Sequence, residues 1–331
     1  KEAIVKHVHH ETQLEFISNY LTQTNKLLDT IPNELVQSGE IHVIAAIVSR
    51  FAQELKENAL VIADKLVHKL NSQATSITEE CLSSFITVIT SLGENSVAFL
   101  PQLKEQLAIA YQSNSPEIII RVNQVIGHLF VITNDQMNDI LELAITSILQ
   151  QLQFLNSDAE GSLLFREQIN TLLIPLSQIL QSISVQELAE NVRDRLFPEF
   201  CGVLSMYTAE RGPFKDDFDL QNTVLEGVLK GFGAVIIASR WNTTYLRRIK
   251  IQLFKFLEPL KRLPYKTDKL MDAFCSFMES AFLVMNNDVV MRNRIRNNQL
   301  YALLFLAQCS KNKEVQVRAK NIYEQIVQAV V

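Results

Sequence analysis

The side chains with the clearest chemical potential are the basic ones in the last third of the chain. Within residues 240–269 the arginines and lysines face only Glu258 and Asp268, and an arginine cluster follows. Guanidinium groups bind carboxylates and phosphates through paired hydrogen bonds, so we predict a site for an acidic partner or for phosphate. A solvated, charged helix face is the alternative interpretation. The predicted site, called the basic patch below, comprises Arg240, Arg247, Arg248, Lys250, Lys255, Lys261, Arg262, Arg292, Arg294 and Arg296.

The spacing of the central members decides how such a patch is presented. On the helix that we expect over residues 242–259, Arg247, Arg248 and Lys255 share one face, away from the leucines. Lys250 falls nearer the apolar side, so its ammonium group has to extend toward water. We therefore predict a concentrated positive field on one face of this helix.

No arrangement of residues indicates catalysis. The sequence contains no phosphate-binding loop, no nucleophile elbow, no zinc-protease helix and no calcium-binding loop. Paired acids such as Glu79–Glu80 and Asp216–Asp217 fall at expected helix starts, where carboxylates interact favourably with the helix dipole. We therefore expect no catalytic residue, no metal and no cofactor, and a protein that is not an enzyme.

The cysteines and histidines do not have the spacing of a metal or redox motif. Cys81, Cys201, Cys275 and Cys309 are far apart, and each has apolar neighbours. We expect buried, reduced thiols. The histidines within residues 7–10 form a small cluster without visible further ligands, so a solvated or capping role is expected.

The elements that must position these residues are helices. The 331 residues include 9 glycines and 8 prolines, fewer than a sheet protein of this size would need for its turns. From residue 76 to residue 152, apolar residues recur at helical spacing in four segments. Gly93 ends the first segment, and residues 113–116 break the second from the third. Such segments, roughly fourteen over the chain, predict an all-α, right-handed α-solenoid of HEAT-type antiparallel helix pairs.

The charge is divided unevenly along the chain. Residues 1–239 contain 15 Lys+Arg and 29 Asp+Glu, a net charge of −14, and residues 240–331 contain 16 and 7, a net charge of +9. Residues 208–219 have the strongest loop composition. We predict an acidic front array over 1–208, a loop or hinge over 209–219, and a basic rear array over 220–331.

Glycines and prolines inside the expected helices carry further predictions. Gly227, Gly231 and Gly233 fall in or near one helix, where close helix–helix contact explains them better than a nucleotide-binding loop. Pro175 and Pro198 are expected to kink or split their helices. No apolar run reaches about 18 residues, so no transmembrane helix is expected. The chain begins within a helical pattern and shows no secretory signal, so we expect a segment of a longer protein.

One pattern in the central stretch is specific enough to compare with a known family. A helix carries Phe-Leu-Pro-Gln-Leu at residues 99–103 and ends at Tyr111; a turn at Pro116 opens a helix containing His128 and Phe130. This stretch resembles the middle of a karyopherin-β nuclear transport receptor, in the transportin-SR and importin-thirteen branch of the HEAT-repeat superfamily. It is also similar to the large HEAT scaffold of the translational stress response.

The first resemblance implies a non-catalytic receptor that carries protein cargo between cytoplasm and nucleus. It implies a Ran-GTP site in N-terminal repeats, which we expect to lie outside this chain, so no residue here is assigned to Ran. We expect a protein partner or cargo with an acidic surface, and no membrane contact. The alternatives are a HEAT scaffold in a translation-control or chromatin-associated complex, and sequence-independent nucleic-acid binding through the basic third.

Overall fold

All regular secondary structure that the computed structural model describes is helical. The structure describes residues 2–71, 74–113, 115–155, 169–183, 186–208, 217–238, 240, 260–261, 263, 266–285 and 304–328. They belong to two compact units, residues 1–144 (unit 1) and residues 145–331 (unit 2). The predicted all-α class is confirmed, and each unit has the layered helix packing of an α-solenoid.

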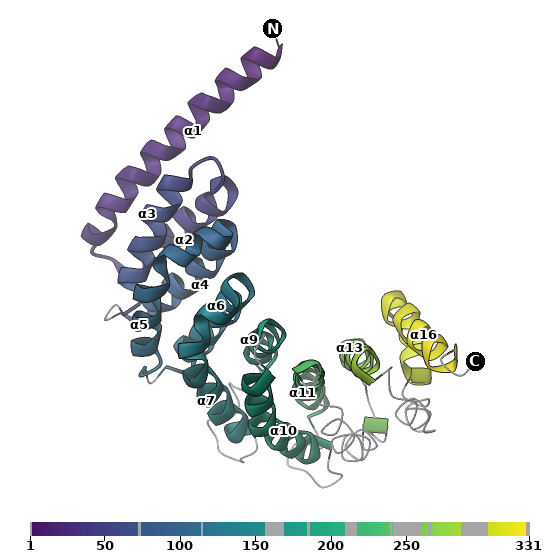
Figure 1. Ribbon diagram of the computed structural model, residues 1–331. Coiled ribbons are helices and arrows are strands. Elements are labelled where there is room, and N and C mark those ends of the chain that lie inside the picture. The colour runs from purple at the N-terminus through teal and green to yellow at the C-terminus, as the bar shows by residue number, and fades with distance from the viewer. Residues whose placement is uncertain are drawn as a thin grey trace. The chain divides into compact units, whose positions relative to one another are not determined.

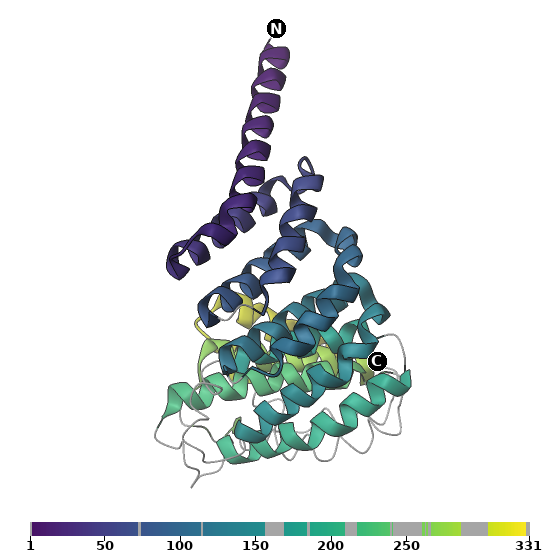
Figure 2. The same ribbon diagram turned by 90° about the vertical axis from the view of Figure 1, so that its left-hand side faces the viewer.

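Unit 1 is built of two layers of helices, visible side by side in Figure 1. One layer contains α2 (Glu34–Phe51), α4 (Thr75–Leu92) and α6 (Pro116–Thr133). The other contains α1 (Glu2–Leu27), α3 (Lys56–Lys69) and α5 (Leu100–Ala110), and Figure 2 shows the length of α1 from a second side. The described residues of this unit also form the 3-10 helices η1 (Leu28–Thr30), η2 (Gly93–Phe99) and η3 (Asn134–Met137). The helix α7 (Asn138–Leu155) begins in unit 1 and ends in unit 2.

Neighbouring helices of one layer run parallel, as side-chain contacts show. Ser76 at the start of α4 donates a hydrogen bond to Glu34 at the start of α2. Ser91 near the end of α4 donates to the carbonyl oxygen of Ser49 near the end of α2. Both pairs are 42 residues apart, which is the length of one repeat here. Helices that follow one another in sequence are therefore antiparallel, as HEAT-type pairs require.

Local signals in the sequence set the helix ends. The side chain of Asn33 accepts a hydrogen bond from the amide of Val36 at the start of α2. Gly93 ends α4 with a φ of 55°, which a residue with a Cβ adopts only under strain. Pro116 opens α6, where its missing N–H leaves no hydrogen bond unmade. The predicted break positions around α4 and α6 are confirmed.

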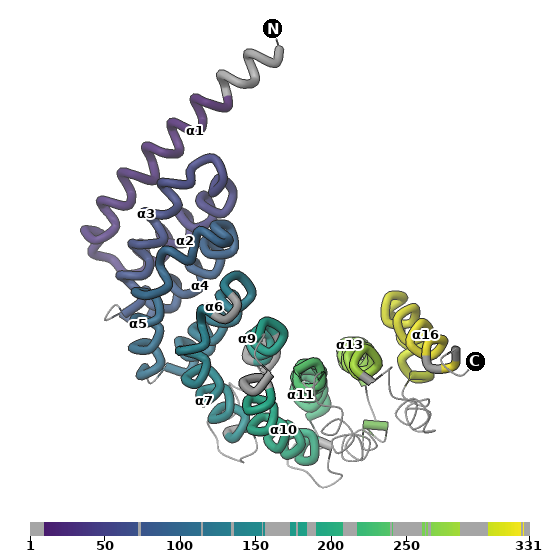
Figure 3. The backbone as a smooth tube through the Cα atoms, viewed as in Figure 1, coloured from purple at the N-terminus to yellow at the C-terminus, as the bar shows by residue number. Residues whose placement is uncertain are grey.

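Unit 2 contains a layer of α9 (Ile169–Ser182), α11 (Phe218–Ala238), α13 (Asp268–Met285) and α16 (Lys313–Gln328), each packed on the next. The helix α10 (Gln186–Thr208) packs against α11. In Figures 1 and 3, α9, α11 and α13 are seen nearly end-on, side by side. Because α11 has neighbours on three sides, nearly its whole circumference is buried.

The glycines of α11 allow these neighbours to approach closely, as predicted. A Cβ added at Gly231 would lie 2.5 Å from the ring of Phe200 on α10. A Cβ at Gly233 would lie 3.2 Å from the hydroxyl of Ser280 on α13. The ring of Phe232 packs against two rings of α10, with its centroid 5.5 Å from that of Phe200 and 5.7 Å from that of Phe197. Two faces of α11 are thus shaped for different helices.

The prediction that the two prolines split their helices was wrong, and the alternative, a kink at each proline, stays a prediction. The helix α9 continues through Pro175, and α10 continues through Pro198. For α10 the packing explains this, because Phe197 and Phe200, on either side of Pro198, both contact Phe232. A proline costs about 3 kcal/mol inside a helix, an amount that tertiary packing of two large rings can offset.

The predicted hinge is only partly described. Residues 209–216 lie outside the described residues, and α11 already begins at Phe218. The boundary between the two compact units lies between residues 144 and 145 of the sequence. The division into arrays at 209–219 therefore stays a prediction.

Candidate partner-binding surface

The structure describes two members of the predicted basic patch. Arg240 follows α11 and is exposed; its guanidinium donates to the carbonyl oxygen of Ile237, and partial burial lowers its pKa. Lys261 is exposed, and its carbonyl oxygen accepts a hydrogen bond from the ammonium group of Lys266. The members that lie outside the described residues are Arg247, Arg248, Lys250, Lys255, Arg262, Arg292, Arg294 and Arg296. The basic patch stays a prediction.

The described residues of unit 1 bring a different charged group together. Glu34 is the first residue of α2, Glu79 and Glu80 lie in the early turns of α4, and Glu117 is the second residue of α6. Because these helices are parallel neighbours, the four carboxylates line one edge of the layer. We call this row the acidic edge. Helix dipoles favour negative charge at the N-terminal ends, so the fold tolerates the row.

Electrostatics across the acidic edge are incompletely compensated. Burial raises the pKa of Glu79, and the negative charge of Glu117 raises it further, whereas Arg121 opposes the shift. Glu80 accepts a hydrogen bond from the hydroxyl of Ser84 and lies 3.1 Å from the ring Nδ1 of His42. Two neighbouring helices therefore place like charges near each other, an arrangement that a basic partner would relieve.

Charges of the other layer of unit 1 are paired between helices. Asp29 contacts Lys65 and Lys69, and hydrogen bonds from both ammonium groups, that of Lys65 first, lower its pKa. Lys104 on α5 lies 2.7 Å from Asp139 on α7. These pairs link successive repeats, so the charges that form them are compensated within the fold.

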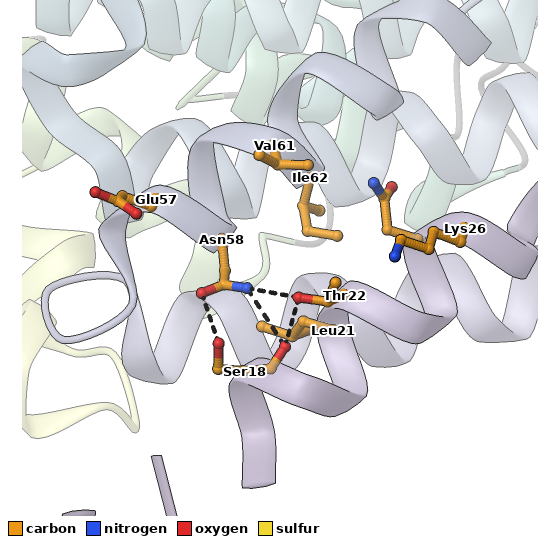
Figure 4. A pocket seen from close by; sticks show the side chains of 9 residues that line it. Ser18, Leu21, Thr22, Lys26, Glu57, Asn58, Val61 and Ile62 are labelled. Carbon is orange, nitrogen blue, oxygen red and sulfur yellow. Dashed lines mark hydrogen bonds between the residues drawn. The ribbon is translucent and has the colours of Figure 1, made fainter. Parts of the chain in front are cut away.

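An open cleft lies between α1 and α3, as Figure 4 shows. Its volume is about 370 Å³, and Leu21 and Ile62 form an apolar floor. The amide of Asn58 accepts a hydrogen bond from the hydroxyl of Ser18 and donates one to that of Thr22. The lining also includes Asn25, Lys26, Glu57 and Val61. The cleft combines an apolar floor with polar walls, which is typical of a ligand site.

The thiols do not form a site. Cys81 and Cys275 are buried and Cys201 is half-buried, and burial raises the pKa of each thiol to about 12. Cys309, in contrast, is exposed in a turn, so the expectation that all four thiols are buried was wrong for it. Among the described residues no group of three side chains could hold a metal ion.

The membrane prediction concerns the same helices. None of the helices that the structure describes is both long enough and apolar enough to span a bilayer.

Comparisons with known proteins identify the fold. No family model matches the chain, and no curated protein sequence matches it. The chain is similar in structure to importin-β. Two crystal structures of importin-β superpose with TM-scores of 0.76 and 0.77 at 14% identity, over 97% of this chain. Yeast importin-β (Kap95p) gives 0.71 at 15% identity over 96% of this chain.

A designed armadillo repeat protein superposes with a TM-score of 0.51 at 14% identity, over 79% of this chain and 98% of its own length. The chain spans only 37–39% of the length of the importin-β chains. At these identities the likeness shows the fold alone, an α-solenoid of the HEAT or armadillo type, and it does not distinguish the transportin-SR and importin-thirteen branch.

Sequence reasoning missed both surfaces of unit 1. The acidic edge had a signal, because glutamates recur near the starts of alternate helical segments, but their alignment depends on parallel packing. The cleft had none, because its lining residues are ordinary polar and apolar members of two separate helices.

Proposed function

We propose that this chain is a non-catalytic, protein-binding segment of a karyopherin-β-type nuclear transport receptor. The observation that supports this most strongly is the similarity to importin-β over 97% of the chain with a TM-score of 0.77. The motif over residues 99–130 resembles the transportin-SR and importin-thirteen branch of this superfamily, and it also resembles the HEAT scaffold of the translational stress response, which is the alternative function. A receptor of this kind carries protein cargo between cytoplasm and nucleus.

Binding by such a segment rests on complementary charge. An acidic partner docks at the basic patch, where arginines form paired hydrogen bonds with carboxylates. The acidic edge of Glu34, Glu79, Glu80 and Glu117 gives basic residues of a partner a second place to dock. Charges of this kind mainly raise the association rate and select among partners.

Ran dependence tests the transport role. Full-length protein containing this chain is incubated with immobilised Ran loaded with GTP or with GDP, because any Ran site is expected outside the chain. We expect retention on the GTP form and release of bound cargo. Equal retention on both forms, or none, would overturn the transport role and leave a general scaffold.

Association kinetics test the basic patch. The probe is a fluorescein-labelled decaglutamate peptide, and the variant is Arg247→Glu with Arg248→Glu and Lys255→Glu. Association should slow at low salt and converge with that of the unchanged protein at high salt, because salt screens exposed charges. In the matched control, Lys311, Lys313 and Lys320 are replaced by Glu. These lysines are exposed, and the three replacements change the net charge by the same amount as the variant does. Equal slowing by variant and control would reject a localised patch.

A further inference from the structure

We propose that the cleft between α1 and α3 binds an extended peptide segment that carries an apolar side chain between a basic and an acidic residue. This inference deepens the proposed protein-binding function and rests on it. Three features of the cleft support it: an apolar floor, a prearranged polar wall, and opposite charges at its two ends.

The rim provides most of the apolar contact, because Val61 on α3 is 54% exposed. Leu21 and Ile62 below it are each 1% exposed, so they are packed between the helices and present little surface to a ligand. A side chain that enters the cleft would cover Val61 and would rest on a floor that does not need to rearrange.

The polar wall is held in place by its own hydrogen bonds. Asn58 on α3 is fixed by Ser18 and Thr22 on α1, with donor–acceptor distances of 3.1 and 3.2 Å. The hydroxyl of Thr22 donates in turn to the carbonyl oxygen of Ser18, at 2.8 Å. Because these groups are already ordered, a ligand that contacts them loses little additional freedom from the protein side.

The ends of the cleft are oppositely charged. Figure 4 shows Glu57 and Lys26 on opposite sides of it, with Val61 and Asn58 between them. Neither charge forms an ion pair with a described residue. A segment that crosses the cleft would therefore meet a carboxylate at one end and an ammonium group at the other. This selects a ligand with one basic and one acidic residue.

Fluorescence anisotropy with defined peptides tests the proposal. The charged probe is fluorescein-Gly-Lys-Ala-Leu-Ala-Glu-Gly-amide, and the neutral probe has Gln in place of Lys and Glu. We expect the charged probe to bind about fivefold or more tightly, from two exposed ion pairs. Equal affinity of the two probes, or no binding of either, would overturn the proposal.

Matched substitutions locate the site. Val61→Asp should abolish binding, whereas Val131→Asp, at an equally exposed valine of α6, should leave it unchanged. Lys26→Glu should reverse the preference, toward a probe with Lys at both charged positions. Equal effects of the two valine substitutions on binding would show that the peptide does not bind in the cleft.

The outcome is separable from that of the proposed function. Retained GTP-dependent binding to Ran without peptide binding would reject the cleft site alone. Peptide binding without Ran dependence would reject the transport role alone.

Discussion

Replacing Gly231 by alanine tests whether α10 and α11 are packed as closely as the structure shows. The new Cβ would lie 2.5 and 2.6 Å from two atoms of the Phe200 ring, closer than real Cβ contacts occur. Phe200 is fully buried and packs against Phe232, so its ring cannot move freely away. Overpacking of this kind costs roughly 1–3 kcal/mol.

The higher helix propensity of alanine offsets part of this loss of stability. Alanine is favoured over glycine inside a helix by about 0.5–1 kcal/mol. We therefore expect Gly231→Ala to lower the free energy of unfolding by about 1–2 kcal/mol, a balance of the two effects. Gly39 on α2 is the matched control, because nothing lies within 4 Å of an added Cβ there. Gly39→Ala should raise stability by about 0.5–1 kcal/mol.

Urea unfolding followed by circular dichroism at 222 nm measures both variants. Gly233→Ala should fall between them, since its nearest neighbour is a serine hydroxyl at 3.2 Å that can rotate. In a protein already carrying Phe200→Leu, the cost of Gly231→Ala should shrink, and the double-mutant cycle gives the coupling. Similar stabilisation by alanine at positions 231 and 39 would refute the close packing of α10 on α11.

Three further predictions concern single side chains. Burial and the charge of Glu117 raise the pKa of Glu79. The folded state therefore binds the Glu79 proton more tightly than the unfolded state, and stability falls as pH rises through the raised pKa. Glu79→Gln should raise the melting temperature at pH 7, and this gain should vanish below the ordinary glutamate pKa of 4.5. Iodoacetamide should modify Cys309 in the folded protein and all four thiols in urea, read by mass spectrometry; protection of Cys309 would contradict its exposure. Arg318 on α16 donates to Glu279 and Ser276 on α13, so Arg318→Met should reduce hydrogen-exchange protection of α16 and leave unit 1 unchanged.

Local patterns sufficed for the class of fold and for many helix ends. Gly93 ends α4 because of its positive φ, and Pro116 begins α6 because a proline fits the first turn. Both effects depend on one residue and its backbone, so the sequence alone reveals them. Pro198 shows the limit of this reasoning, because contacts of Phe197 and Phe200 with another helix keep α10 continuous.

Surface arrangement was harder to predict than helix position. The glutamates of the acidic edge are far apart in sequence, and they align only because α2, α4 and α6 are parallel neighbours. Cys309 has apolar sequence neighbours, yet the turn that contains it faces solvent. For the basic patch, the outcome depends on residues outside the described part of the chain, so the charge pattern remains the basis of that prediction.

The spacing of the bonds between helices has a consequence for folding. The hydrogen bonds between neighbouring helices join residues 42 apart for Ser91 and Ser49, 36 apart for Lys65 and Asp29, and 39 apart for Arg318 and Glu279. Each such contact closes a loop of about one repeat, so the entropy lost on closure is similar at each step and does not grow along the chain. Order can therefore begin at any helix pair and spread to its neighbours, and a damaged repeat weakens those beside it far more than distant ones.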